Sequence, residues 1–141
     1  MARIRVKVNL DLKKIDARVT QILEDYGPQI SVALQDSIAN EQFDYPVDTY
    51  RRARRQFVPK GLRDIIDTGT LLQSQTAPVV QKNILTIRWT APYSKAVLEG
   101  GYIVESKRGN YVAPARNWIT PALREKPFIP FVVNRWRALS Q

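Results

Sequence analysis

Apolar positions in the first 40 residues predict a strand followed by one long helix. Residues 3–9 alternate between polar and apolar side chains, which is typical of a half-buried strand. From Asp11 to Asn40 apolar residues recur every three or four positions, as on a helix that covers a sheet, and Asp11 can cap its first turn. The apolar stripe continues in phase across Gly27-Pro28, so we expect a kink there, with a functional hinge as the alternative.

Residues 41–60 have no clean period, and we expect a long arginine-rich loop. Tyr50 and Phe57 flank a basic cluster formed by Arg51, Arg52, Arg54 and Arg55. Basic side chains interleaved with aromatic ones bind nucleic acid through phosphate contacts and stacking. The same composition is typical of a solvated loop, or of a segment that becomes ordered only against a neighbouring subunit.

The middle of the chain predicts a short helix and a hairpin. Asp67-Thr-Gly69 is typical of a turn that opens a helix, with Leu71 and Leu72 turned inward. Two β-prone runs between residues 77 and 90 flank Lys82-Asn83, which predicts a β-hairpin.

The next predicted element is a second short helix that two glycines end. Pro92 suits its first turn, because the missing N–H has no partner at that position. Tyr93 and Val97 share one face at helical spacing. Gly100 and Gly101 end the helix, because glycine adopts the left-handed conformation without a Cβ penalty.

Another hairpin and a further helix follow. Residues 101–113 are typical of two strands joined by a turn that carries Lys107 and Arg108, either a contact finger or a solvated turn. Thr120 can cap a helix with Pro121 at its first position.

Residues 127–141 predict a C-terminal helical extension that Pro130 opens. Val132, Trp136 and Leu139 share one face of this extension. Its apolar residues exceed one stripe, which indicates a surface that a partner covers.

These elements predict an α+β fold class, with one domain over residues 1–141. We expect a small, mostly antiparallel β-sheet packed against the long N-terminal α-helix, with short additional helices. Hydrophobic residues make up 44% of the chain, which is enough for a core. No stretch approaches the roughly 18 apolar residues of a membrane span, and the start lacks an apolar signal segment, so we expect a cytosolic protein.

The composition narrows the possible chemistry. The chain has no cysteine and no histidine, which removes disulfides, thiolate metal sites and the usual general base. We expect no catalytic residues, no cofactor and no metal. Asp64, Asp67 and Glu99 around a magnesium ion would be the nuclease alternative, but their spacing matches no ligand pattern. Asp67-Thr-Gly69 also resembles the aspartic-protease triplet, which needs two such carboxylates in an all-strand context.

The positive charge lies mainly in the second half of the chain. The net charge is +9, with 12 basic and 10 acidic residues in 1–70 and 10 basic and 3 acidic residues in 71–141. Such a basic surface attracts phosphate, an acidic protein or an anionic membrane, although it also serves solubility alone.

Three segments follow the long amphipathic helix in order. They are Asp67-Thr-Gly-Thr-Leu-Leu-Gln-Ser74, Ala91-Pro-Tyr-Ser-Lys-Ala-Val-Leu-Glu-Gly100 and Pro114-Ala-Arg-Asn-Trp-Ile-Thr-Pro-Ala-Leu123. In this order they resemble the tail-completion family of tailed bacteriophages and prophages, also called neck or head–tail joining proteins. The resemblance covers roughly residues 11–125. The chain departs from the family pattern at Leu98-Glu-Gly-Gly101 and at Asn117-Trp-Ile119.

The resemblance implies a structural virion protein that forms a homo-oligomeric ring, a hexamer or a dodecamer, at the neck. Such a ring completes or terminates the tail, surrounds the DNA channel, and contacts portal-side connector and tail-tube proteins. It implies the virion as the location, with assembly in the host cytoplasm and non-specific contact with duplex DNA. A stand-alone basic nucleic-acid-binding module is the alternative function.

The candidate residues fall into two groups. Contacts with DNA or a neighbouring ring are expected from Arg51, Arg52, Arg54, Arg55, Lys107 and Arg108. Residues that maintain the motifs and the fold are Gly69, Leu71, Tyr93, Val97, Glu99, Gly100, Pro121, Ala122 and Leu123. In the second group, we expect Glu99 to pair with an arginine and the last three residues to pack the closing helix.

Overall fold

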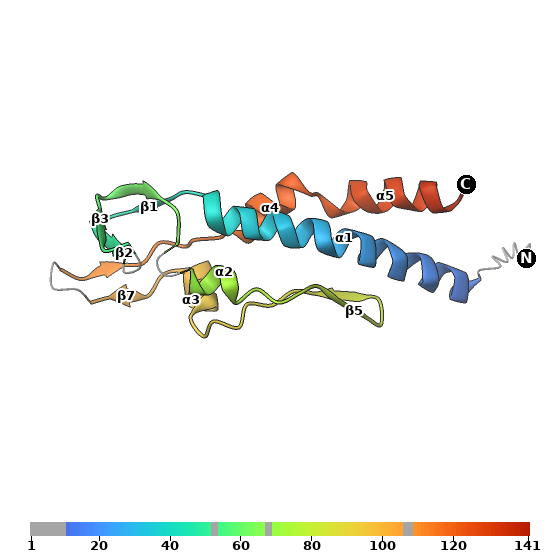
Figure 1. The fold of residues 1–141 in the computed structure, drawn as a ribbon, viewed down its shortest axis with the longest axis horizontal. Coiled ribbons are helices and arrows are strands. Elements are labelled where there is room, and N and C mark those ends of the chain that lie inside the picture. The colour runs from blue at the N-terminus through green and yellow to red at the C-terminus, as the bar shows by residue number, and fades with distance from the viewer. Residues whose placement is uncertain (1–10, 52–53, 67–68, 106–108) are drawn as a thin grey trace, which may run out of the picture.

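We describe the fold from a computed structural model, which describes residues 11–51, 54–66, 69–105 and 109–141. The molecule is elongated, and a long helix, α1 (Leu12–Asn40), runs along much of its length (Figure 1). The predicted strand at residues 3–9 lies outside the described residues. The α+β class is confirmed, because small antiparallel sheets and short helices accompany α1.

The predicted long helix is confirmed as a single element that includes Pro28. Asp11 caps it, since its carboxylate accepts a hydrogen bond from the Lys14 N–H at 3.1 Å. Gly27 has a packing role within this helix. A Cβ atom at Gly27 would lie 3.0 Å from Cβ of Pro78, so the glycine allows a neighbouring hairpin to approach α1 closely.

Antiparallel strands form four two-stranded ribbons within the described residues. The first two ribbons are nested, and the other two are hairpins. The pairs are β1 (Phe43–Tyr45) with β4 (Gly61–Arg63), β2 (Thr49–Arg51) with β3 (Gln56–Val58), β5 (Val79–Gln81) with β6 (Ile84–Thr86), and β7 (Ile103–Val104) with β8 (Tyr111–Val112).

The nested ribbons correct the expected loop at residues 41–60. Tyr45 pairs with Gly61 in the outer ribbon, and Tyr50 pairs with Phe57 in the inner one. Each of these strands is only three residues long, which is too short for an alternation of polar and apolar side chains to reveal a strand in the sequence. The pairing of β5 with β6 and of β7 with β8 confirms both predicted hairpins. They could be predicted because consecutive residues of the sequence signal each turn.

Four further helices complete the fold. They are α2 (Thr70–Gln73), α3 (Ser94–Glu99), α4 (Ile119–Glu125) and α5 (Phe128–Leu139). α5 lies alongside α1 and runs in the opposite direction (Figure 1).

Three predicted helix starts are wrong. Pro92 lies in a turn before α3, which begins at Ser94, and not in the first turn of that helix. α4 begins at Ile119, and the side-chain oxygen of Asn117, two residues earlier, accepts hydrogen bonds from the N–H groups of Ile119 and Thr120. Thr120 and Pro121 therefore lie inside the first turn, where the missing proline N–H has no cost. α5 begins at Phe128, before Pro130, so this proline also lies within the first turn.

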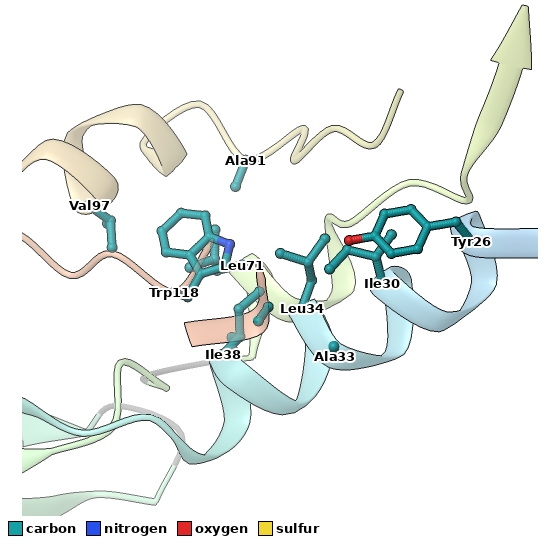
Figure 2. Packing of buried hydrophobic residues seen from close by; sticks show 10 residues of the cluster. Tyr26, Ile30, Ala33, Leu34, Ile38, Leu71, Ala91, Val97 and Trp118 are labelled. Atoms are coloured by element: carbon teal, nitrogen blue, oxygen red, sulfur yellow. The ribbon is translucent and has the colours of Figure 1, made fainter. Parts of the chain in front are cut away.

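The core forms where the short elements meet the second half of α1. Trp118 is 1% exposed and makes an edge-on contact with Trp89, with ring centroids 5.3 Å apart. The Ser37 hydroxyl donates a hydrogen bond to the Trp118 carbonyl at 2.5 Å, which fixes α4 on α1. Figure 2 shows this tryptophan among Val97, Leu71 and the apolar side chains of α1.

Candidate functional site

The inner ribbon carries the arginine cluster at its tip. Arg54 and Arg55 form the turn between β2 and β3, and both side chains are exposed. Arg55 has a φ of +49°, a left-handed conformation that closes the tight turn. Arg51 belongs to β2, but its side chain, like Arg52 as a whole, lies outside the described residues.

The second basic candidate, Lys107-Arg108, also lies outside the described residues. The ribbon that flanks it, β7–β8, is at the same end of the molecule as β2–β3 (Figure 1). Acidic side chains are present there as well. Asp44 and Asp48 are exposed, and the Asp48 carboxylate accepts a hydrogen bond from the Lys60 N–H at 2.9 Å. The end of the molecule that carries β2–β3 and β7–β8 therefore has both positively and negatively charged side chains.

The motif residues of the first two segments converge on the core. Gly69 precedes α2 with a φ of +83°, a left-handed position that favours glycine. Leu71 and Val97 are buried in one cluster against α1. Tyr93 directly precedes α3 and is 41% exposed, so it forms part of the surface rather than of the core.

Two expected roles of motif residues are wrong. Glu99 faces Lys95, one helical turn away, with a nitrogen–oxygen distance of 4.0 Å, instead of an arginine. Both side chains are largely exposed, so this pair contributes little to stability. In α4 Ala122 is buried, whereas Leu123 is 44% exposed because the next residue along a helix turns away from the core.

A cluster of arginines and tyrosines joins the nested ribbons to β7–β8. The Arg116 guanidinium donates hydrogen bonds to the Pro114 carbonyl at 3.2 Å, to the Tyr45 hydroxyl at 3.4 Å and to the Tyr102 hydroxyl. The guanidinium carbon of Arg63 lies 4.9 Å from the Tyr45 ring centroid, and that of Arg116 lies 5.7 Å from it. Both cations therefore lie within cation–π distance of the Tyr45 ring.

Arg63 has a structural role in this cluster. Its side chain is buried and donates hydrogen bonds to the Asp64 carbonyl, the Ile66 carbonyl and the Thr49 hydroxyl. These bonds tie the outer ribbon to the inner one. A buried arginine needs such a complete set of acceptors.

Arg116 is the electrostatic centre of the cluster. Burial tends to lower the pKa of Arg116, but its interactions with Tyr45 and Tyr102 raise that pKa above the ordinary value, so the guanidinium stays charged. Burial raises the pKa of the neighbouring Tyr111 phenol, although Arg116 opposes this shift. The Tyr111 phenol is consequently neutral near neutral pH.

Arg116 opens onto a cavity of about 490 Å³ between α2, α3 and the β7 region. The wall is mostly apolar and includes Ile38, Leu72 and Val97. The polar residues of its lining are Thr70, Arg116 and three tyrosines, Tyr93, Tyr102 and Tyr111. This volume and this composition are typical of a ligand-binding or docking pocket.

The carboxylates of the nuclease alternative have other partners where they are described. The Asp64 carboxylate accepts a hydrogen bond from the Ile66 N–H at 2.9 Å, and Glu99 faces Lys95. Asp67 lies outside the described residues. Across the described part of the chain, acidic side chains form no cluster of three that could hold a metal ion.

Sequence reasoning missed the arginine–tyrosine cluster. Tyr45 lies 71 residues before Arg116, so no local spacing connects the two, and Tyr102 approaches Arg116 only across the β7–β8 hairpin. The nearest signal was the position of Arg116 within the third motif.

No family model, curated protein or solved structure matches this chain. None of the helices in the described ranges combines the length and the apolar character needed to cross a bilayer.

Proposed function

We propose that this chain is a structural virion protein of a tailed bacteriophage and forms part of the neck ring that joins head and tail. The proposal begins with the three motif segments, which resemble the tail-completion family in their order and spacing. The ring would complete the tail and surround the DNA channel. Its partners would be portal-side connector proteins and tail-tube proteins.

One observation carries the proposal: the three motifs form one structural unit. Leu71 of the first segment and Val97 of the second, both labelled in Figure 2, belong with Ala122 of the third to a single core against α1. Segments that match by chance have no reason to meet in space. Their convergence in one core supports the resemblance at the level of the fold as well as at the level of the amino-acid sequence.

Exposed apolar side chains support an assembled subunit. On α5 Ile129 is 69% exposed and Val133 follows one turn later, while Leu62 of β4 and Phe57 of β3 are exposed at the other end. A subunit in a closed ring presents two different complementary faces, and apolar groups on separate elements suit that geometry.

The arginines at the tip of β2–β3 suit a contact with packaged duplex DNA or with the next ring. Attraction between exposed arginines and phosphate needs no base sequence, as a DNA channel requires. This contact and the virion location belong to the proposal, as does assembly in the host cytoplasm.

The direct test is the mass and shape of the purified protein at low and high salt, by light scattering and electron microscopy. We expect rings of six or twelve subunits, either alone or after addition of portal or tail-tube proteins. A persistent monomer that joins none of these partners and binds duplex DNA with strong salt dependence would contradict the proposal and favour a nucleic-acid-binding module.

A further inference from the structure

We infer that the cavity beside Arg116 is a docking site for an acidic segment of a partner protein, one that places an apolar side chain next to a carboxylate. The apolar side chain would enter between Leu72 and Val97. The carboxylate would bind the Arg116 guanidinium. This inference goes beyond ring formation and does not depend on it.

Charge complementarity decides the sign of the ligand. Arg116 is held in place by three oxygen acceptors, none of which is a carboxylate: the Pro114 carbonyl and the hydroxyls of Tyr45 and Tyr102. Within the described part of the chain, the cavity lining contains no acidic residue. A guanidinium has five N–H donors, so donors remain for a carboxylate, which it can bind in a bidentate manner.

The residues around Arg116 fix the position of its guanidinium. Tyr45 is almost completely buried and its hydroxyl accepts a hydrogen bond from the guanidinium, and the backbone N–H of Arg116 donates to the Val97 carbonyl at 3.0 Å. The cation is therefore anchored to α3 and to β1 before any ligand arrives. A preorganised donor loses little entropy on binding, which strengthens the contact.

The lining favours a protein segment over a free small molecule. Tyr93 and Tyr102 line the cavity and are about two-fifths exposed, so part of each side chain is at the surface. Tyrosine and arginine around an apolar pocket are the residue types that dominate the energetics of protein–protein interfaces. The volume of about 490 Å³ accommodates one large side chain and part of its backbone.

The test uses the full chain and two blocked peptides, acetyl-Gly-Phe-Glu-Gly-amide and its Gln counterpart, with binding followed by amide chemical shifts in NMR spectra. We expect the Glu peptide to shift the amides of Gly69, Leu72 and Val97 and to bind at least about tenfold more tightly than the Gln peptide, as for loss of one charge-assisted hydrogen bond. Arg116→Gln should abolish this preference, and Arg124→Gln on α4 should preserve it.

A pair of variants on one strand tests the pocket itself without removing the cation. Val104 lines the cavity, whereas its neighbour Ile103 is 69% exposed and does not. Val104→Phe should fill the cavity and weaken Glu-peptide binding at least tenfold, and Ile103→Phe should leave it unchanged. The dispersion of the NMR spectrum will show whether Arg116→Gln disturbs the fold. If it does, the comparison of Val104→Phe with Ile103→Phe decides whether the peptide binds in the cavity.

Three results would overturn the inference. They are equal affinity for the Glu and Gln peptides, an unchanged affinity in Val104→Phe, or binding of free 3-phenylpropionate without binding of the blocked Glu peptide. The last result would assign the cavity to small carboxylates instead of a protein segment. None of them bears on ring formation, which mass and microscopy measure separately.

Discussion

At Gly100 the chain leaves α3 with a φ of +63°, and residues 114–115 pass directly beside it. A Cβ atom would lie 2.3 Å from the Ala115 nitrogen and 2.5 Å from the Pro114 carbonyl carbon. We expect Gly100→Ala to lower the free energy of unfolding by about 3 kcal/mol, because strained backbone and a clash with main-chain atoms add together. Urea unfolding monitored by circular dichroism measures this loss.

Gly101→Ala is the matched control for that substitution. Gly101 also has a positive φ, of +81°, but no atom lies within 4 Å of its ideal Cβ position. Its substitution should cost only the backbone term, about 1 kcal/mol. Equal losses in the two variants would show that the close approach of residues 114–115 does not restrict Gly100.

Single residues differ in how far the sequence reveals their role. Gly100 was predictable as a helix end, because its position after an apolar helical stretch is a local signal. The contact with residues 114–115 was not predictable, since it depends on how a distant segment returns. Arg116 is the stronger case, because its partners Tyr45 and Tyr102 reach it only through tertiary structure.

The turn between β5 and β6 provides a prediction for a whole element. Lys82 and Asn83 both have positive φ, +50° and +61°, as in a type I′ hairpin turn. Lysine is a poor residue for this conformation, so Lys82→Gly should raise the free energy of unfolding by about 0.5–1 kcal/mol. Asn83 is kept, because its side chain bonds Thr20 and Asp16 on α1. Thermal and urea unfolding measure the gain.

Lys60→Gly serves as the control, because Lys60 is exposed and does not have a positive φ. There glycine only increases the entropy of the unfolded chain, and we expect a loss of a few tenths of a kcal/mol up to about 1 kcal/mol. A gain of similar size in both variants would mean that removal of positive charge, rather than turn geometry, stabilises the protein.

Elements that neighbouring residues of the sequence signal were predictable. Strands that exist only because they pair with a distant part of the chain were not. α1 carries its stripe over 29 residues, and β5–β6 carries its turn signal, so both were found. The outer ribbon joins β1 to β4 across an insert that is itself a ribbon. Three-residue strands give no period, and their pairing depends on the buried Arg63 that holds both ribbons.

The two ends of the elongated molecule are formed by different elements. The start of α1 and the end of α5 lie together at one end, where Arg18 bonds Ser140 and stacks over Trp136 (Figure 1). The nested ribbons lie at the opposite end. Because the 29 residues of α1 separate these ends, a change of charge at one end should not disturb the structure of the other.

This separation allows the proposed contact with DNA to be located. We expect Arg54→Glu with Arg55→Glu to weaken duplex-DNA binding by the assembled protein. The slope of log affinity against log salt concentration should become flatter by about 2, since each lost phosphate contact removes about 0.9 from it. Fluorescence anisotropy with a labelled duplex at several salt concentrations measures both quantities, and phage assembly measures the yield of joined heads and tails.

The control for that pair is Lys13→Glu with Lys14→Glu, which produces the same change in net charge at the far end of α1. Both lysines are exposed, and acidic side chains in the first helical turn are favourable to the helix dipole, so the fold should persist. If the two double variants weaken binding equally, attraction follows net charge alone and the β2–β3 tip makes no specific contact. If only the arginine pair weakens binding, the phosphates lie at the ribbon end, which would then face the channel while the α1–α5 end faces away from it.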